Sequence, residues 1–191
     1  MKTLGVGIVL MVALFFCLPY HLYMKQLWKK NPEKSWEKAR KFVSGFFRFE
    51  LKLSGCKVNV IGKENIPQDG PVLFVGNHRS YFDILIYHEA IGKPLGFLAK
   101  KEMEKIPLLP LYMRDIGCLF LDREDIKQGL SVIKQGTEYM KQGHSMVVFP
   151  EGTRNQPDTL LPFREGGYKM AEKSKSPIVP VSICRSDLML E

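Results

Sequence analysis

The feature of this sequence that most limits its possible folds is an alternation of two patterns after Gly55. Short β-type runs alternate with longer segments in which apolar residues recur at helical spacing. The runs occupy residues 57–62, 71–76, 96–100, 117–122, 145–150 and 178–183. Such alternation is typical of a mostly parallel sheet with helices on its faces. We therefore predict an α/β domain over residues 56–191, with a mostly parallel β-sheet flanked by helices.

Three of these runs end in polar or charged residues. The run at 71–76 is followed by Asn77 and His78, the run at 117–122 by Arg123, and the run at 145–150 by Glu151. In sheets of this kind, ligands bind where the strands end and the loops begin. We therefore expect the functional residues at these three strand ends.

The first strand end holds a histidine and an aspartate five residues apart, in "NHRSYFD". Inside one helix, five residues at about 100° each would place the two on different faces. They can pair only if His78 lies in the turn after the strand and Asp83 lies in the first helical turn. The carboxylate would then fix the tautomer of His78 and raise the basicity of its other ring nitrogen, which can take a proton from a hydroxyl.

A structural interpretation of the same residues stands beside the catalytic one. Ser80-x-x-Asp83 is also a capping box, in which Asp83 needs only to satisfy backbone N–H groups at a helix start. His78 can then be an ordinary exposed loop residue. The two roles of Asp83 do not exclude each other.

The other two strand ends carry arginines. "FPEGTR" brings Glu151 and Arg154 to the end of a buried strand, and "FLDR" does the same for Arg123. Arginine suits phosphate through its planar fork of donors, and Gly152 would free backbone N–H groups for an anion. Each of these charges alone can be a solvated loop residue. Together with a base, they indicate chemistry on a hydroxyl of a phosphorylated molecule.

The first 55 residues have a different character. Residues 3–24 contain no charged side chain, and residues 35–53 place aromatics opposite Lys and Arg at helical spacing. The second pattern is typical of a helix lying in a bilayer interface. We predict that residues 1–55 form a membrane-anchoring two-helix hairpin with its turn at residues 31–35. The basic flank places the following domain on the cytoplasmic face of the cell membrane.

Other interpretations of this segment stay open. The first helix can span the bilayer once or re-enter it, since about 20 apolar residues suffice to span. A signal peptide would need a small-residue cleavage site, which "CLPYHLY" does not supply. The segment at 35–53 can also be an ordinary amphipathic helix that caps the domain.

The net charge of +8 favours an anionic partner. Seven Lys or Arg residues stand against two Glu between Lys25 and Lys41, next to the apolar segment, which favours a membrane surface over nucleic acid. We therefore predict no nucleic-acid partner. The four cysteines fit no zinc spacing, so no metal site is predicted.

Four segments together carry a resemblance. "NHRSYFD", "GCLFLDR", "FPEGTR" and "IVPVSI" resemble, in order, the four sequence blocks of the H-x4-D glycerolipid acyltransferase family, over residues 72–183. The similarity is strongest to bacterial members that acylate lysophosphatidic acid. It implies transfer of an acyl chain from an acyl carrier protein or coenzyme A thioester to the sn-2 hydroxyl, giving phosphatidic acid, with no further cofactor.

The resemblance also implies roles for individual residues. His78 would be the general base, oriented by Asp83, and the hydroxyl would attack the thioester directly, since the sequence offers no GxSxG elbow. Lys101 would stabilise the tetrahedral oxyanion. The lysophosphatidate-binding set would comprise Arg123, Glu151, Gly152, Thr153 and Arg154.

Within that set, the arginines would hold the phosphate, and Glu151 would orient an arginine or accept a hydrogen bond from a hydroxyl. Two alternatives stay open. The acceptor can be glycerol 3-phosphate or another lysophospholipid, or the protein can be a non-catalytic module that binds anionic lipid at the bilayer.

Overall fold

The structure, a computed structural model, describes residues 11–155 and 159–189. At its centre is a five-stranded sheet in the order β3-β2-β4-β1-β5, in which all four neighbouring pairs are parallel. The strands are β1 (Leu73–Gly76), β2 (Leu95–Lys100), β3 (Leu119–Leu121), β4 (Ser145–Val148) and β5 (Ile178–Val181). The predicted parallel sheet is therefore confirmed.

One predicted strand is wrong. Residues 57–62 form no strand, and the side chains of Val60 and Ile61 are exposed. The apolar pattern of this segment finds no neighbouring strand to pair with, so it runs as an extended connection from the helical hairpin to the sheet.

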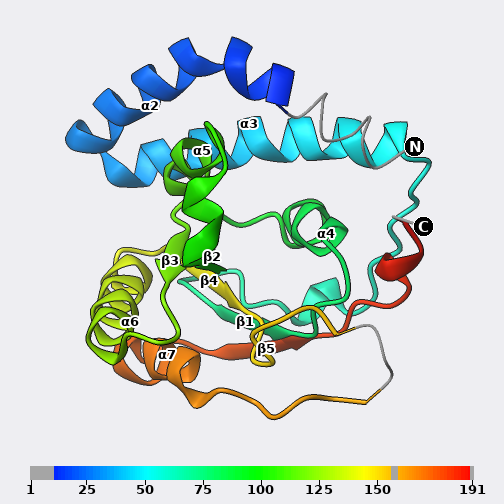
Figure 1. Ribbon diagram of the computed structural model, residues 1–191, viewed down its shortest axis with the longest axis vertical. Helices are drawn as coiled ribbons and strands as arrows, with labels where there is room; N and C mark the ends of the chain where they lie inside the picture. The colour runs from blue at the N-terminus through cyan, green and yellow to red at the C-terminus, as the bar shows by residue number, and fades with distance from the viewer. Residues whose placement is uncertain (1–10, 156–158, 190–191) are drawn as a thin grey trace.

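Helices cover both faces of the sheet (Figure 1). They are α2 (Leu18–Lys30), α3 (Pro32–Leu53), α4 (Phe82–Ile91), α5 (Leu109–Asp115), α6 (Ile126–Lys141) and α7 (Tyr168–Ser174), and residues 11–16 are also helical. Four 3-10 turns complete the described elements: η1 (Lys63–Asn65), η2 (Lys101–Lys105), η3 (Glu165–Gly167) and η4 (Ser186–Met189).

The core forms on both faces because strand side chains alternate in direction. Phe74 and Val147 point toward the α3–α4 side and join one buried cluster. Leu73 and Met146 point toward α6 and α7 and join the other. Full burial of each such side chain contributes about 1.5–3 kcal/mol. The sheet is thus held rigidly between two helical layers, which fixes where its strand ends lie.

Helices α2 and α3 form the predicted hairpin. The turn is shorter than residues 31–35, because α3 already begins at Pro32. The Asn31 side chain accepts a hydrogen bond from the Lys34 N–H (2.9 Å), and Pro32 suits the first helical position. Tyr20 stacks on Phe42 between the two helices, with ring centroids 4.2 Å apart.

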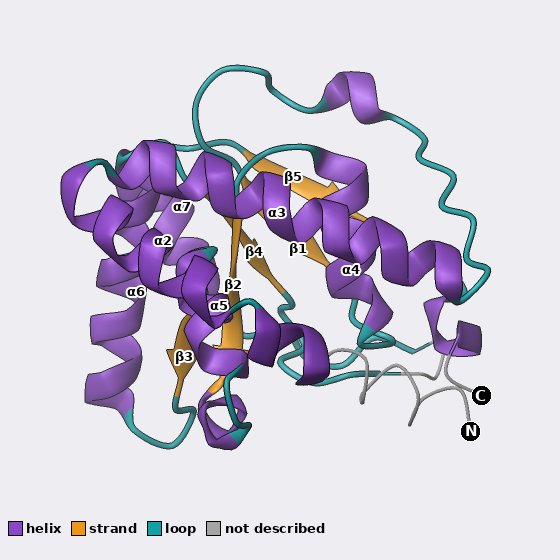
Figure 2. Cartoon of the chain, turned by 90° about the horizontal axis from the view of Figure 1, so that it is seen from above, coloured by secondary structure: helices purple, strands orange, loops and turns teal. Residues whose placement is uncertain are grey.

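The inner face of α3 packs on the protein. Trp36 and Ala39 are buried, and α3 crosses over α4 and the sheet (Figure 2). That part of the predicted bilayer-facing stripe is therefore wrong, and the domain-capping alternative is confirmed for these residues. An amphipathic pattern does not distinguish a bilayer from a protein surface as the apolar partner.

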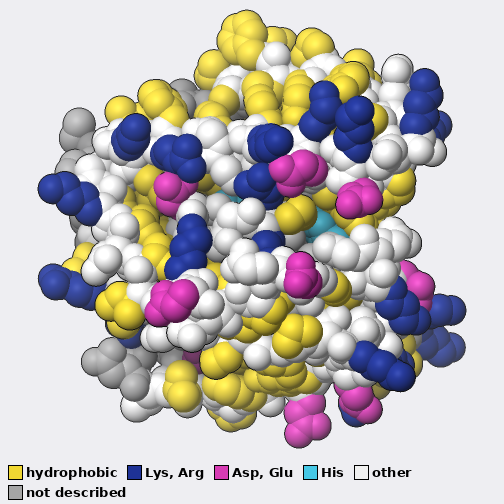
Figure 3. Space-filling view, turned by 180° about the vertical axis from the view of Figure 1, so that it is seen from behind, with side chains coloured by type: hydrophobic (Ala, Val, Ile, Leu, Met, Phe, Trp, Pro, Cys, Tyr) yellow, Lys and Arg dark blue, Asp and Glu magenta, His cyan; other side chains and the backbone are white. Residues whose placement is uncertain are grey.

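No helix in the described ranges is long and apolar enough to cross a bilayer. The predicted apolar segment 3–24 begins at residues that lie outside those ranges. Hydrophobic side chains gather along the top of the face in Figure 3, over the hairpin, with Lys and Arg side chains beneath them. Phe15, Phe16 and Leu22 are among the exposed apolar residues of the hairpin.

Candidate active site

The parallel sheet brings the predicted residues to one edge. His78 follows β1, Glu151 follows β4, Lys101 follows β2, and Arg123 lies two residues after β3. Because β1, β4, β2 and β3 are successive neighbours and all parallel, these strand ends form one continuous row. The expectation that the motif loops meet at one edge of a sheet is confirmed.

His78 and Asp83 pair as the spacing predicted. The Nδ1 atom of His78 lies 2.7 Å from Oδ2 of Asp83, with His78 in the turn after β1 and Asp83 in the first turn of α4. The same oxygen accepts hydrogen bonds from the backbone N–H groups of Arg79 (2.7 Å) and Ser80 (3.0 Å). Asp83 thus both orders the loop and binds the imidazole.

This geometry fixes what His78 can do. An ionised carboxylate only accepts hydrogen bonds, so Nδ1 carries the proton and Nε2 keeps its lone pair. The His78 side chain is 16% exposed, while Asp83 is fully buried. The imidazole stacks on the ring of Phe149, with centroids 4.1 Å apart and planes 13° from parallel. A held, accessible imidazole with one free nitrogen is the arrangement of a general base.

Phe149 is a site residue that sequence analysis missed. It lies directly after β4, the neighbour of β1, so the parallel pairing carries its ring to the same height as His78. In the sequence, Phe149 is only the apolar residue before Pro150, and nothing in the local pattern places it beside His78.

Tyr87 was also not predicted as a site residue, although its spacing of four residues from Asp83 indicates that the two share a helix face. It lies one helical turn after Asp83 on α4, and burial together with the charge of Asp83 raises its pKa. Within the described ranges, neither its hydroxyl nor Oδ1 of Asp83 has a hydrogen-bond partner, and both are buried. A Cβ at Gly76 would overlap the Tyr87 hydroxyl. Glycine at the end of β1 therefore makes room for a neutral hydroxyl beside the dyad.

Glu151 shapes the loop after β4. It is buried, and its Oε2 accepts hydrogen bonds from Nδ2 of Asn155 (2.7 Å) and the N–H of Leu161 (3.0 Å). The Asn155 N–H in turn donates to the backbone oxygen of His78 (2.7 Å). No arginine of the described chain is hydrogen-bonded to Glu151, so the structure does not show the predicted orientation of an arginine, and the alternative of a hydrogen bond from a hydroxyl stays a prediction. The carboxylate instead ties the loop together beside the dyad.

The N–H group of Gly152 itself is used within the loop, while the prediction that this turn frees other backbone N–H groups for an anion stays a prediction. Its N–H donates to the Phe149 oxygen (2.9 Å) and is therefore not free for an anion. Its φ of +74° is left-handed, a conformation that favours glycine. A Cβ here would lie 3.1 Å from Nε of Arg164 and 3.4 Å from Cζ of Arg123. The absence of a side chain lets two guanidinium groups approach the same turn.

Arg164 was not predicted from the sequence. Its N–H donates to the Pro150 oxygen (2.9 Å), which fixes its backbone beside the loop. Burial and the neighbouring charge of Arg164 lower the pKa of Arg123. Arg154 lies elsewhere, with its guanidinium 3.9 Å from the centroid of the Tyr81 ring, and both Arg154 and Thr153 are exposed. The predicted arginines thus occupy two separate places at this edge.

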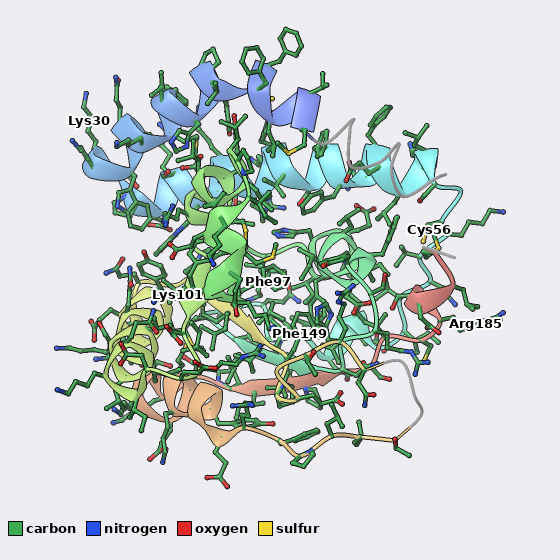
Figure 4. The ribbon with its side chains drawn as sticks, in the orientation of Figure 1. Lys30, Cys56, Phe97, Lys101, Phe149 and Arg185 are labelled. Atoms are coloured by element: carbon green, nitrogen blue, oxygen red, sulfur yellow. The ribbon has the colours of Figure 1, made fainter. Side chains whose placement is uncertain are left out.

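Lys101 follows β2, which lies two strands away from β1, the strand that ends next to His78. Its Nζ is 2.8 Å from Oδ2 of Asp122, and this hydrogen bond raises its pKa. Strand β4 separates β2 from β1, and neighbouring strands are about 5 Å apart. Figure 4 shows Lys101 on the α6 side, well away from Phe149. The oxyanion role of Lys101 stays a prediction that requires the side chain to leave Asp122.

A cavity of about 650 Å³ lies apart from this edge, between α2, α5, α6 and β3. None of the predicted site residues lines it. Its walls include His21 and Asp115, which form a second His–Asp pair at 2.7 Å. Cavity size alone therefore does not mark the candidate active site.

The fold and the dyad define a class of protein: an α/β domain with a His–Asp pair and several arginines at the carboxyl edge of a parallel sheet. Residues 57–184 match the Acyltransferase family, and the chain therefore belongs to this family. The resemblance found in the four sequence blocks is confirmed.

Proteins similar to this chain indicate which members of the family it resembles. The chain is 37% identical over 160 residues to a probable 1-acyl-sn-glycerol-3-phosphate acyltransferase of Mycoplasma pneumoniae, covering 81% of this chain and 58% of that protein. It is 34% identical over 136 residues to the 1-acyl-sn-glycerol-3-phosphate acyltransferase of Borreliella burgdorferi, covering 71% and 54%. The chain thus spans little more than half the length of these curated relatives.

A solved structure supports the same assignment. The crystal structure of the 1-acyl-sn-glycerophosphate acyltransferase PlsC from Thermotoga maritima superimposes with a TM-score of 0.79 at 29% identity. The match covers 97% of this chain and 74% of that one, so it includes the helical hairpin as well as the sheet.

Proposed function

We propose that this protein transfers an acyl chain from an acyl thioester to the sn-2 hydroxyl of lysophosphatidic acid, giving phosphatidic acid. The observation that carries the proposal is the 2.7 Å pair of His78 and Asp83 at a sheet edge that also carries arginines. Relatives named 1-acyl-sn-glycerol-3-phosphate acyltransferase support this choice of acceptor.

In the proposed mechanism, Nε2 of His78 takes the proton of the sn-2 hydroxyl as its oxygen attacks the thioester carbonyl. The C–O bond forms, and Asp83 stabilises the resulting imidazolium. The tetrahedral intermediate then collapses, the C–S bond breaks, and the thiolate takes the proton from His78. General-base assistance of this kind contributes about 10²- to 10⁴-fold to the rate.

For substrate binding, we propose that the arginines hold the phosphate of the acceptor. Arg123 lies at the Gly152 turn, one strand from the dyad, and Arg154 lies over Tyr81, close to the His78 loop. In lysophosphatidic acid, the phosphate is only a few bonds from the sn-2 hydroxyl. The phosphate and the hydroxyl can therefore both lie at this one edge of the sheet. Glu151 and Gly152 act by shaping the loop that carries this site.

We also propose that the hairpin keeps the site at the cytoplasmic face of the cell membrane. The exposed apolar residues Phe15, Phe16 and Leu22 and the basic stretch between Lys25 and Lys41 support this attachment. The acyl donor would come from the cytoplasm, as an acyl carrier protein or coenzyme A thioester.

The decisive experiment uses the purified full chain in detergent micelles with lysophosphatidic acid. Acyl carrier protein and coenzyme A thioesters are supplied in parallel, and phosphatidic acid is measured by mass spectrometry. Wild type is expected to form product with one or both donors, whereas His78→Ala should lose at least about 10²-fold in turnover.

A matched control is available in the second His–Asp pair. His21→Ala removes an imidazole from an equally short pair that lies away from the proposed site, and it should keep wild-type turnover. Full activity of His78→Ala would overturn the mechanism. Product from glycerol 3-phosphate or another lysophospholipid, with none from lysophosphatidic acid, would overturn the proposed acceptor.

A further inference from the structure

We propose that Arg164 and Arg123 form a two-arginine clamp that selects acceptors ending in a phosphate monoester. This inference rests on the proposed acyl transfer and assigns a specificity role to Arg164. It adds to the dyad a reason why lysophosphatidic acid is preferred over lysophospholipids with larger headgroups.

The clamp is built by three segments that are distant in sequence. Arg123 lies two residues after β3, Arg164 comes just before η3, and Gly152 lies in the loop after β4. Measured from the position of a Cβ on Gly152, Nε of Arg164 is 3.1 Å away and Cζ of Arg123 is 3.4 Å away. The hydrogen bond from the Arg164 N–H to the Pro150 oxygen anchors one side.

The two guanidinium groups have no salt-bridge partner within the described chain, although the negative charge of Glu102 acts on Arg123. No carboxylate there forms a salt bridge with Arg123 or Arg164, whereas Arg79 pairs with Asp187, Arg48 with Glu89 and Arg114 with Glu104. In the loop after β4, the carboxylate of Glu151 accepts hydrogen bonds from Asn155 and Leu161. Two adjacent like charges repel each other, so an anion bound between them would be stabilised.

The chemistry of two guanidinium forks defines the anion. Each planar fork can donate two parallel hydrogen bonds to neighbouring oxygens. A phosphate monoester presents three terminal oxygens and a charge of about −1.5 to −2 near pH 7. A phosphodiester presents two terminal oxygens and a single charge. Two forks therefore match the monoester of lysophosphatidic acid better than the diester of a lysophospholipid with a headgroup.

The test compares two acceptors in mixed micelles, lysophosphatidic acid and lysophosphatidylglycerol, with whichever thioester supports turnover. kcat and KM are measured for wild type, Arg164→Gln, Arg164→Lys and the control Lys173→Gln, which removes one positive charge from the exposed surface of α7. For Arg164→Gln, we expect KM for lysophosphatidic acid to rise at least about tenfold with kcat within about threefold, since charged hydrogen bonds are lost. The preference for lysophosphatidic acid should fall by a similar factor.

Two further readouts separate a clamp from a general loss of charge or of structure. Arg164→Lys keeps the charge but not the fork, and it should have an intermediate preference, whereas Lys173→Gln should match wild type. The wild-type preference should also decrease below about pH 6, where the monoester loses its second charge, and this decrease should vanish in Arg164→Gln.

The outcomes distinguish this proposal from the function on which it rests. If wild type forms phosphatidic acid but both Arg164 variants keep the wild-type ratio of kcat/KM values, the clamp is wrong and the acyl transfer stands. If wild type acylates neither acceptor, the proposed function fails and the clamp fails with it. Should Arg164→Gln lose its fold, as judged by circular dichroism, Arg164→Lys and the pH dependence decide.

Discussion

The buried side chain of His88 is expected to lower the stability of the folded protein in acid, and this can be tested. It lies on α4, fully buried between the hairpin and the sheet, with ring centroids 5.3 Å from Phe47 and 5.5 Å from Phe97. Within the described ranges, neither of its ring nitrogens has a hydrogen-bond partner. Burial, with a smaller effect from the charge of Arg40, lowers the pKa of His88 to about 3.

The direction of the effect follows from proton linkage. The unfolded chain binds a proton at His88 below its ordinary pKa of 6.5, whereas the folded protein does not until about pH 3. Stability is therefore lost as the pH falls from 6.5 toward 3. At pH 5, the difference of 1.5 pH units corresponds to about 2 kcal/mol, which is a large part of a typical 5–15 kcal/mol.

Other groups titrate in the same range, so the variant must be compared with wild type. Burial also lowers the pKa of His144 to about 3, which adds to the acid loss. Burial raises the pKa of Glu50 to about 7, which opposes it, because the folded protein then binds a proton before the unfolded chain does. Only the difference between His88→Phe and wild type isolates the contribution of His88.

The assay is urea unfolding of both proteins in the same detergent at pH 7 and pH 5. His88→Phe keeps an aromatic ring in place and removes both unpaired nitrogens. We expect it to lose about 2 kcal/mol less than wild type between the two pH values. Equal losses in the two proteins would refute the argument that His88 is buried in its neutral form.

Two further predictions concern the active site. Asp83→Asn keeps an oxygen that can accept from the Arg79 and Ser80 N–H groups but loses the charge that orients His78, so kcat should fall at least about 10²-fold while urea stability changes little. Wild-type kcat in this variant would contradict the dyad. Lys101→Met should lower kcat about tenfold or more with KM for lysophosphatidic acid unchanged if Lys101 stabilises the oxyanion. A rise in KM alone would instead assign Lys101 to the phosphate.

The parts of the structure that the sequence predicted correctly depend on local patterns. The pairing of His78 with Asp83 requires only a strand end, a turn and a helix start within five residues, and all three were recognisable. The parallel sheet followed from the alternation of strand and helix patterns. Residues 57–62 carried a similar strand pattern, but a strand also needs a neighbour, and none is supplied by the local sequence.

The parts that were missed depend on contacts between distant segments. Arg164 reaches the Gly152 turn only because its backbone returns to Pro150. Glu151 and Gly152 were assigned to the substrate-binding set, but the loop uses the carboxylate of Glu151 and the N–H of Gly152 for its own hydrogen bonds. Buried polar groups at a strand end form hydrogen bonds with one another even without a substrate. Motif positions therefore predicted which loops meet at one edge of the sheet, but not which atoms these loops use for their own hydrogen bonds.

The two His–Asp pairs of this protein show why distance alone does not identify a base. Both pairs are 2.7 Å long, but their aspartates differ. Asp83 also accepts hydrogen bonds from two backbone N–H groups, which fix its orientation toward His78. Asp115 accepts a hydrogen bond only from His21 among the described residues, and burial raises its pKa. The first carboxylate is held beside an imidazole at the edge that carries the motif loops, whereas the second joins α2 to α5. This difference in surroundings supports the proposal that His78 is the base.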